Sequence, residues 1–366
     1  MDEGYEIDLL AVGSGERSGD AICVRYGTPG NYRVMIYDGG TRESGENLVR
    51  HVREHYGTNY VDFVVCSHPD ADHASGLTTV LENMTVGALW MHRPWMYSEA
   101  IRQYFKDGRI TDNSLTERLR GKLSAAYALE ELAATRGIPV HEPYQGAQIG
   151  AFHVMSPNKT WYVHTLIADF AKSPDSKGAF SSAENAWVRT MYAASKEMLA
   201  GVAESWGIET LREDVSTSAE NESSAVLVGE IGERKILLTG DAGIQALGVT
   251  ASYAEARGIS LPQTVKFIQV PHHGSRNNVS PSILDRLIGP RSYSPLSETS
   301  LTAFVSAAKE SKTHPRKAVV NGFLRRRAEV IATKGQSIRH HFKMGPRDNW
   351  GAVQSLPFYQ EVESWD

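Results

Sequence analysis

The chain has 366 residues, 41% of them hydrophobic and 22% charged, which is ordinary for a soluble globular protein with one large domain or two small ones. The net charge of −5 excludes an overall basic field that would attract nucleic acid, so such contact would need a local patch. No stretch approaches the ~20 apolar residues of a membrane span, and the acidic start lacks a signal peptide's pattern, so we expect a cytoplasmic protein without a membrane partner.

Apolar and β-branched runs predict a strand-rich start of the chain. The expected elements are strands over 7–12, 21–26, 32–37 and 60–66, with a helix over 45–56 before the last strand. The second and third strands form a hairpin around residues 27–30 (Gly-Thr-Pro-Gly). Cys23 and Cys66, the two cysteines, lie in these apolar runs, so we expect small buried residues and no disulfide.

The middle of the chain, from about 92 to 215, is mainly helical in pattern and predicts an insertion into a single domain over residues 1–366. The expected segments are long helices over 115–136 and 183–206, short strands over 138–141 and 151–155, and a polar loop over 168–182. We expect this insertion to act as a cap near the site.

Strand patterns return after residue 220. The expected elements are a hairpin of strands over 223–230 and 234–239, strands over 265–270 and 329–333, and helices over 244–257, 300–310 and 316–326. The sequence contains no internal repeat of fixed period and no low-complexity tract. The scaffold is therefore built from strands at both ends of the chain, with a helical middle.

The most informative segment is His-Pro-Asp-Ala-Asp-His at residues 68–73, directly after a predicted buried strand. Its two imidazoles and two carboxylates, on His68, Asp70, Asp72 and His73, are good ligands for a divalent metal. Pro69 and Ala71 fit a loop better than a helix. Single Asp and His residues are common as caps, but four ligand types in six positions favour metal binding.

Two later strands end in the same way. Asp241 follows the strand over 234–239, and His272-His273 follow the strand over 265–270. If these strands lie side by side, their ends converge at one edge of the sheet. Taken alone, Gly240-Asp241 is equally well a strand-to-helix turn and the histidines a buried pair. Together with the first loop, they indicate one metal site assembled from distant segments.

The order of these pieces resembles the metallo-β-lactamase fold family, whose usual signature is His-x-His-x-Asp-His. The matching motifs are Asp38-Gly39-Gly40, residues 68–73, Gly240-Asp241 and residues 271–275 (Pro-His-His-Gly-Ser). Asp70 stands where the second His is expected, as in the metallo-β-lactamase-like domain of the ComEC DNA-uptake family. The resemblance covers roughly residues 5–90 and 220–340 and implies an α/β (α+β) fold, a four-layer αβ/βα sandwich with the site along one edge.

The resemblance also implies residue roles. His68 and Asp70 would bind one metal, Asp72 and His73 a second, and Asp241 would bridge them. His273 is the favoured ligand of the pair, with His272 close behind. Asp38 would orient the loop from behind the ligands, and His314, before Pro315, would be a ligand or a substrate contact.

One departure affects the metal. Where many family members carry a further His ligand, this chain has Asn221-Glu222-Ser223-Ser224, and neither His153 nor His164 has suitable surroundings. With three carboxylates and no thiolate, the site favours Mn²⁺ over a strict Zn²⁺ site. The expected cofactor is therefore a pair of divalent ions, Mn or Zn.

The first functional hypothesis is a two-metal phosphodiesterase, specifically a nuclease that cleaves DNA, the DNA part being implied by the resemblance alone. Asp72 would handle the proton, and either the second metal or His314, as general acid, would stabilise the leaving oxygen. Ser275, Arg276 and Asn277 are candidate contacts for a phosphate oxygen, with Arg276 equally plausible as a surface residue.

Other functions stay open. The insertion could restrict the site to a small phosphodiester, cyclic nucleotide, lactone or thioester, and an inactive interaction or effector module is a third reading. The local basic run Arg325-Arg326-Arg327 is a candidate nucleic-acid patch, although a solvated helix face is the preferred interpretation. The oligomeric state is not predicted by the sequence.

Overall fold

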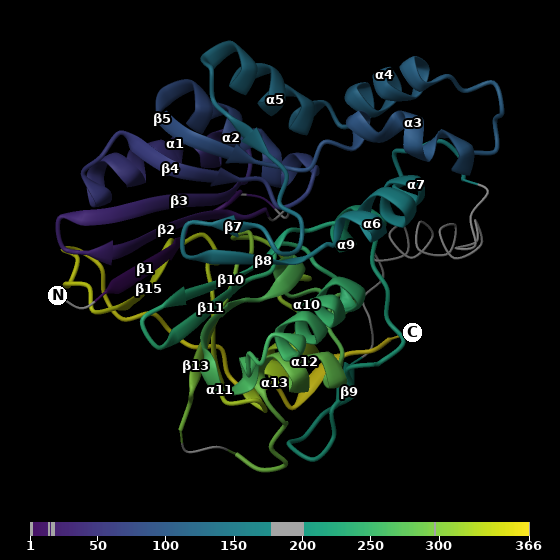
Figure 1. The fold of residues 1–366 in the computed structure, drawn as a ribbon. Coiled ribbons are helices and arrows are strands. Elements are labelled where there is room, and N and C mark those ends of the chain that lie inside the picture. The colour runs from purple at the N-terminus through teal and green to yellow at the C-terminus, as the bar shows by residue number, and fades with distance from the viewer. Residues whose placement is uncertain (1–2, 14, 16–18, 177–200, 296–297, 366) are drawn as a thin grey trace.

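The computed structural model describes residues 3–13, 15, 19–176, 201–295 and 298–365. Two seven-stranded sheets lie face to face, and helices cover the outer face of each (Figure 1). This four-layer arrangement of a mixed α/β chain confirms the expected fold class. The layers bring strand ends from both halves of the chain to one edge, where the candidate site lies.

The first sheet holds most of the N-terminal strands. In spatial order it contains β15 (Ile338–Phe342), β1 (Gly4–Leu9), β2 (Ala21–Thr28), β3 (Asn31–Gly39), β4 (Tyr60–Val65), β5 (Thr85–Trp90) and β6 (Val140–His141). β2 and β3 form the expected antiparallel hairpin, and β3 to β6 run parallel. The parallel strands therefore point their carboxyl ends, and the loops that follow, in one direction.

The second sheet is built mainly from the C-terminal third. In spatial order it contains β14 (Ala328–Ala332), β13 (Leu301–Val305), β12 (Val265–Gln269), β11 (Arg234–Leu238), β10 (Val226–Ile231), β8 (Phe152–Ser156) and β7 (Gln148–Ile149). β11 to β14 are parallel, and β10 and β11 form the expected hairpin. A separate two-stranded sheet pairs β16 (Glu361–Glu363) with β9 (Gly201–Ala203).

Helices form the two outer layers and the middle region (Figure 1). The first sheet is covered by α1 (Arg42–His51), α2 (Ala71–Asn83) and α5 (Ser124–Arg136). The second is covered by α10 (Ile244–Ala256), α11 (Leu261–Thr264), α12 (Pro281–Ile288) and α13 (Lys317–Leu324). Among the described residues, the remaining α-helices are α3 (Ser98–Ile101), α4 (Asp112–Lys122), α6 (Lys159–Trp161), α7 (Ile167–Asp169) and α9 (Ala219–Glu222).

Three buried clusters hold the layers together. One packs the first sheet against its helices, one packs the second sheet against its helices, and the third fills the space between the sheets. In the central cluster Tyr37 of β3, Phe152 of β8 and Phe267 of β12 are fully buried. Burial of these apolar faces is the dominant stabilising contribution. Cys23 and Cys66 are buried free thiols, as predicted.

The region over 92–215 is less separate from the scaffold than an insertion would be. Its strand β6 extends the first sheet, and β7 and β8 extend the second. The predicted helix over 115–136 is present as α4 and α5, joined at Leu123. Most of the segment expected to be helical over 183–206 lies outside the described residues, and its end contributes β9.

The prediction of a helix over 300–310 is wrong, because residues 301–305 form β13 between β12 and β14. The run Leu-Thr-Ala-Phe-Val is β-branched and aromatic, and it is buried on both sides by the parallel sheet. The apolar residues Ala307 and Ala308 follow this run, and together with it they give a spacing that resembles that of a helix. Among the helices of the described ranges, none is long and apolar enough to cross a bilayer.

Candidate metal centre

The candidate centre lies where loops from both sheets meet. Asp38 is near the end of β3, the loop with His68 follows β4, Asp241 follows β11 and His273 follows β12. In the described part of the chain, His and Asp ligand atoms gather within 4.8 Å of one another in two groups that share His73. The groups are Asp20, His73, Asp241 and His273, and Asp38, His68 and His73.

Asp241 is the centre of this cluster. Its Oδ2 lies 3.4 Å from His73 Nε2 and 3.9 Å from the Nε2 atoms of His68 and His273. The same oxygen is 3.6 Å from His272 Nδ1. One carboxylate therefore faces four imidazoles from two segments, residues 68–73 and 271–274.

The buried donor set fits a divalent cation. The Nε2 atoms of His68 and His73, both ring nitrogens of His273 and Asp241 Oδ1 are buried and have no hydrogen-bond partner. Such groups are costly to leave unsatisfied, and most buried polar atoms in proteins have a partner. Imidazole nitrogen and carboxylate oxygen are ligands for Zn²⁺ and Mn²⁺, so a bound ion would satisfy several of these atoms together.

Asp38 orders the two histidines of the loop. Its Oδ1 accepts from the Ser67 backbone N–H at 2.7 Å, and its Oδ2 accepts from Ser67 Oγ at 2.6 Å and from His73 Nδ1 at 2.9 Å. Because the Ser67 hydroxyl donates its single proton to Asp38, it accepts from His68 Nδ1 at 2.9 Å. Both imidazoles therefore carry a proton on Nδ1 and direct Nε2 toward the cluster.

Burial and charge act in opposite directions on this cluster. Burial lowers the pKa of His68, and it lowers the pKa of His273 to about 4, so both rings are neutral near pH 7. Burial also disfavours a charged His73, but Asp241 and Asp38 outweigh it and raise the pKa of His73. Burial opposes ionisation of Asp241, yet the surrounding imidazoles hold its pKa well below the ordinary value. A neutral imidazole beside an ionised carboxylate is a ligand pair ready for a cation.

The two aspartates of the 68–73 motif differ in position. Asp70 Oδ2 lies 3.7 Å from His68 Nε2, whereas Asp70 Oδ1 pairs with Lys172 Nζ at 2.6 Å. Asp72 is partly exposed and belongs to neither ligand group, although its charge acts on Asp20 and His273. The expected loop is in fact short, because α2 already begins at Ala71 with Asp70 in the capping position. Asp72 and His73 are therefore held by the first turn of a helix.

The histidine pair occupies a strained turn at Pro271–Gly274. His272 and His273 have left-handed backbone angles, with φ of 46° and 56°, and Asp38 has φ of 58°. Asn221 Nδ2 donates to His272 Nδ1 at 2.7 Å, so this asparagine supports the ring at the place where relatives were expected to have a histidine. His273, and not His272, belongs to a ligand group, in line with the preference stated from the sequence.

His314 lies beside the pair, with its ring parallel to that of His272 at a centroid distance of 6.4 Å. Burial lowers the pKa of His314 to about 3, with a further contribution from the neighbouring histidines. The ring is neutral near pH 7, so it lacks the second, acidic proton that an imidazolium would donate. The structure therefore does not favour the general-acid role expected for His314 at neutral pH.

Two residues at this edge were missed by the sequence reasoning. Asp20, at the start of β2, joins a ligand group, and its Oδ2 accepts from Gln269 Nε2 at 2.8 Å. Lys172 pairs with Asp70. The Gly19-Asp20 pair after a glycine-rich turn was a usable signal for Asp20, whereas nothing in the sequence around Lys172 singles it out.

Of the three proposed phosphate contacts, Arg276 is engaged away from the centre. Arg276 is only 9% exposed, and its guanidinium donates to the carbonyls of Glu363 and Ser364. It also lies over the Trp365 ring, 4.2 Å from the centroid. Arg276 therefore fixes the C-terminal segment, which corrects both its expected phosphate contact and its alternative as a surface residue. Asn277 donates its backbone N–H to Ser275 Oγ at 3.3 Å, a bond local to the turn.

The basic run at 325–327 is mostly internal. Arg325 and Arg326 are 0% and 1% exposed and pair with Glu204 at 3.0 Å and Glu209 at 2.7 Å. Arg327 alone is exposed. Both sequence interpretations, a nucleic-acid patch and a solvated helix face, are therefore wrong for the first two arginines, because buried acids hold them in the fold.

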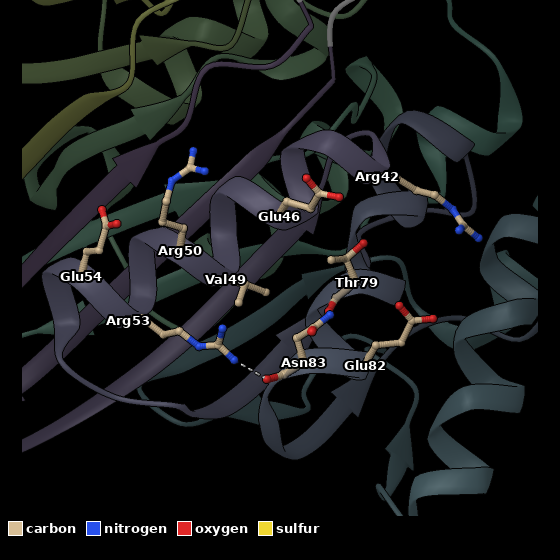
Figure 2. Close-up of a pocket in the computed structure, with 9 residues that line it drawn as sticks. All are labelled: Arg42, Glu46, Val49, Arg50, Arg53, Glu54, Thr79, Glu82 and Asn83. Carbon is tan, nitrogen blue, oxygen red and sulfur yellow. Dashed lines mark hydrogen bonds between the residues drawn. The ribbon is translucent and has the colours of Figure 1, made fainter.

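A separate cavity of 480 Å³ lies on the outer helical layer, away from the ligand groups. Figure 2 shows its lining, with Arg42, Glu46 and Arg50 on α1 and Thr79 and Glu82 on α2. Three arginines and three glutamates line it, and none of its lining residues belongs to the candidate centre.

No family model matches the chain, and no curated protein matches it in sequence. Among solved structures, it is similar to the metallo-β-lactamase fold protein YhfI from Bacillus subtilis (TM-score 0.40, 9% identity, 92% of this chain and 100% of that one). It is also similar to a diphosphatase of the PhnP family (0.39, 10%, 93% and 97%) and to AidC, a dizinc quorum-quenching lactonase (0.33, 10%, 68% and 71%). Likeness at these TM-scores carries no functional information, so the function rests on the residues of the centre.

Proposed function

We propose that this protein is a metal-dependent hydrolase that cleaves phosphodiesters with two divalent ions. The observation that carries the proposal is the buried cluster in which Asp241 lies within 4 Å of the rings of His68, His73, His272 and His273. Asp20 and Asp241 supply carboxylates within it, Asp70 Oδ2 lies beside it at 3.7 Å from His68 Nε2, and the described ligand set contains no thiolate. This oxygen-rich set favours Mn²⁺, with Zn²⁺ as the alternative.

When bound, two divalent ions would polarise the phosphoryl group and lower the pKa of water, which makes it a stronger nucleophile near neutral pH. The chain's own residues would hold and orient the reacting groups. Asp20, His68, Asp70, Asp72, His73, Asp241 and His273 would hold the ions. Asp38 fixes the ring of His73 directly and the ring of His68 through Ser67. Asp72, partly exposed at the rim, is the candidate for accepting the proton of the attacking water.

The choice of substrate within this class has two candidates. A DNA substrate rests on the sequence resemblance to the ComEC family alone. A small phosphodiester is favoured by burial of Arg325 and Arg326, because the basic run that would have contacted a polymer is internal. The net charge of −5 likewise offers no general attraction to a polyanion.

The test combines metal analysis with three substrates. Purified protein should contain or take up about two divalent ions and hydrolyse bis-p-nitrophenyl phosphate, and a chelator should abolish the activity. Cleavage of plasmid DNA as well would identify a nuclease, whereas cleavage of the small diester alone would identify the second candidate. Binding of metal with no hydrolysis of diester, DNA or lactone would contradict the proposal and favour an interaction module.

Residue roles are tested in the same assay. Asp72→Ala should reduce turnover by at least about 10²-fold while the far-ultraviolet circular dichroism stays unchanged, because a positioned acid–base group contributes 10²–10⁴-fold. His153→Ala is the matched control, since this half-buried histidine of β8 belongs to neither ligand group. Full turnover by Asp72→Ala would remove Asp72 from the mechanism.

A further inference from the structure

The cation of Lys172 is held at the rim of the candidate centre. Lys172 Nζ lies 2.6 Å from Asp70 Oδ1, and the lysine side chain is 36% exposed. Among the ion pairs of the described residues, this is the one in which a lysine or arginine meets a candidate metal ligand. Arg276, the basic residue that the sequence favoured for this role, is engaged by the C-terminal segment.

Hydrogen bonds and aromatic packing fix the backbone around Lys172. The Lys172 N–H donates to the Oε1 of buried Glu220 at 3.3 Å, and Ser173 Oγ donates to the Ile167 carbonyl at 2.7 Å. Phe170, 2% exposed, packs against the Tyr162 ring at a centroid distance of 6.2 Å. The flexible lysine stem therefore starts from a defined point, and its ammonium reaches the mouth of the centre.

The charge of the centre explains why a cation is needed there. Asp20, Asp38, Asp70 and Asp241 lie in or beside the ligand groups, so an anionic substrate would approach several carboxylates. Two bound divalent ions would balance these four carboxylates, and the carboxylate of Asp72, whose charge also acts on the centre, would leave an excess of one negative charge. An ammonium group has three N–H donors, so Lys172 can keep one on Asp70 and direct another to a substrate oxygen.

We infer that Lys172 is a specificity-determining residue for anionic esters. Its ammonium binds a non-bridging oxygen of the phosphoryl group of a phosphodiester. The inference deepens the proposed function and rests on it. A neutral ester or lactone carries no such oxygen and gains nothing from the lysine. Lys172 therefore sets a preference for anionic substrates at a site whose own ligands would otherwise repel them.

The experiment compares Lys172→Gln and Lys172→Arg with Lys235→Gln as a control. Lys235 forms a pair of similar length with Glu230, 2.8 Å, on the β10–β11 hairpin and outside the ligand groups. Each variant is loaded with Mn²⁺, and its metal content is measured. Steady-state kinetics are then recorded with bis-p-nitrophenyl phosphate, which is anionic, and p-nitrophenyl acetate, which is neutral. Calorimetry gives the affinity for inorganic phosphate.

Lys172→Gln should raise KM for the diester and weaken phosphate binding about tenfold, which corresponds to about 1.4 kcal/mol. Its kinetics with the neutral ester should change less than about twofold. Lys172→Arg should restore most of the phosphate affinity, because it keeps the charge. Lys235→Gln should match the wild type throughout.

Equal losses with both esters, or unchanged phosphate affinity in Lys172→Gln, would overturn the inference and leave Lys172 as a partner of Asp70 only. The phosphate titration separates this failure from that of the proposed function. If the wild type hydrolyses neither ester, the proposed function fails, but the difference in phosphate affinity between wild type and Lys172→Gln still decides the role of Lys172.

Discussion

Gln269 of β12 donates its side-chain N–H to Asp20 of the first sheet at 2.8 Å, and so joins the two sheets beside the candidate centre. Its Oε1 accepts from the backbone N–H groups of Thr239 and Gly240 at 2.9 and 3.1 Å. Gln269 is fully buried. One amide therefore fixes the start of β2 and the turn that carries Asp241 relative to each other.

Gln269→Leu should lower both stability and metal affinity. The leucine would leave two backbone N–H groups and an Asp20 oxygen buried without a partner, at about 1–3 kcal/mol for each group. We expect a loss of at least about 2 kcal/mol in the free energy of unfolding of the metal-free protein, measured in urea, and about a tenfold loss of Mn²⁺ affinity. Gln148→Leu, at an exposed glutamine, is the control. Unchanged metal affinity in Gln269→Leu would show that this link does not position the centre.

Asp20→Asn tests whether the aspartate that the sequence analysis missed is a ligand. Asparagine can still accept from Gln269, but its neutral amide is a poor ligand, so metal affinity should fall roughly 10- to 100-fold with little change in thermal stability. Asp62→Asn is a matched control, because Asp62 is also buried and accepts from Arg33 and the Val34 N–H far from the ligand groups. That control should lose stability and keep its metal. The reverse pattern would assign Asp20 a purely structural role.

Arg326→Ala should destabilise the fold strongly. Removing the guanidinium leaves Glu209 buried with only Arg291 as an ionic partner, and breaking a buried pair costs about 3–5 kcal/mol. Arg327→Ala, at the exposed neighbour, should change the free energy of unfolding by less than about 0.5 kcal/mol. Equal stability of the two variants by chemical denaturation would contradict the structural role assigned to Arg326.

Asp8 should contribute to acid stability. Burial opposes its ionisation, but His51 and Arg347 prevail and lower its pKa from 3.8 to about 2. Because the folded-state pKa lies below the unfolded value, the stabilisation is present above pH 4 and is lost as the pH falls through 2. The stability difference between the wild type and Asp8→Asn should therefore shrink by about 2 kcal/mol between pH 5 and pH 2.

The measurement for Asp8 is denaturant unfolding at several pH values. Glu233→Gln, an exposed acid in the β10–β11 turn, is the control and should show a difference near zero at every pH. A difference for Asp8→Asn that is constant across this range would mean that the carboxylate keeps its ordinary pKa.

Much of the scaffold was predictable because its strands have strong local signals. The β2–β3 and β10–β11 hairpins and the buried strands β4 and β12 follow directly from apolar, β-branched runs. Asp241 and His273 meet because β11 and β12 are parallel neighbours whose carboxyl ends share an edge. Residues 68–73 follow β4 of the other sheet, so their approach to this pair depends on how the two sheets pack. The four-layer arrangement came from the family resemblance and not from these patterns.

What could not be predicted depends on contacts between segments far apart in the sequence. Arg325 is drawn inward by Glu204, 121 residues away, and Lys172 meets Asp70 across 102 residues. The residues that neighbour each partner in the sequence do not predict such ion pairs. The misassigned helix over 300–310 has the same origin, because β13 is specified by its two neighbours in the sheet more than by its own residues.

Asp38, His272 and His273 hold left-handed backbone angles that side-chain-bearing residues avoid, and such conformations cost of order 1–3 kcal/mol each. Glycine at any of the three would relax the chain and at the same time delete a group that the centre uses. At these positions a substitution that raises the thermal stability of the fold therefore removes a side chain that the activity needs. A variant library selected for thermostability alone should drift toward glycine there, and would do so by erasing the activity.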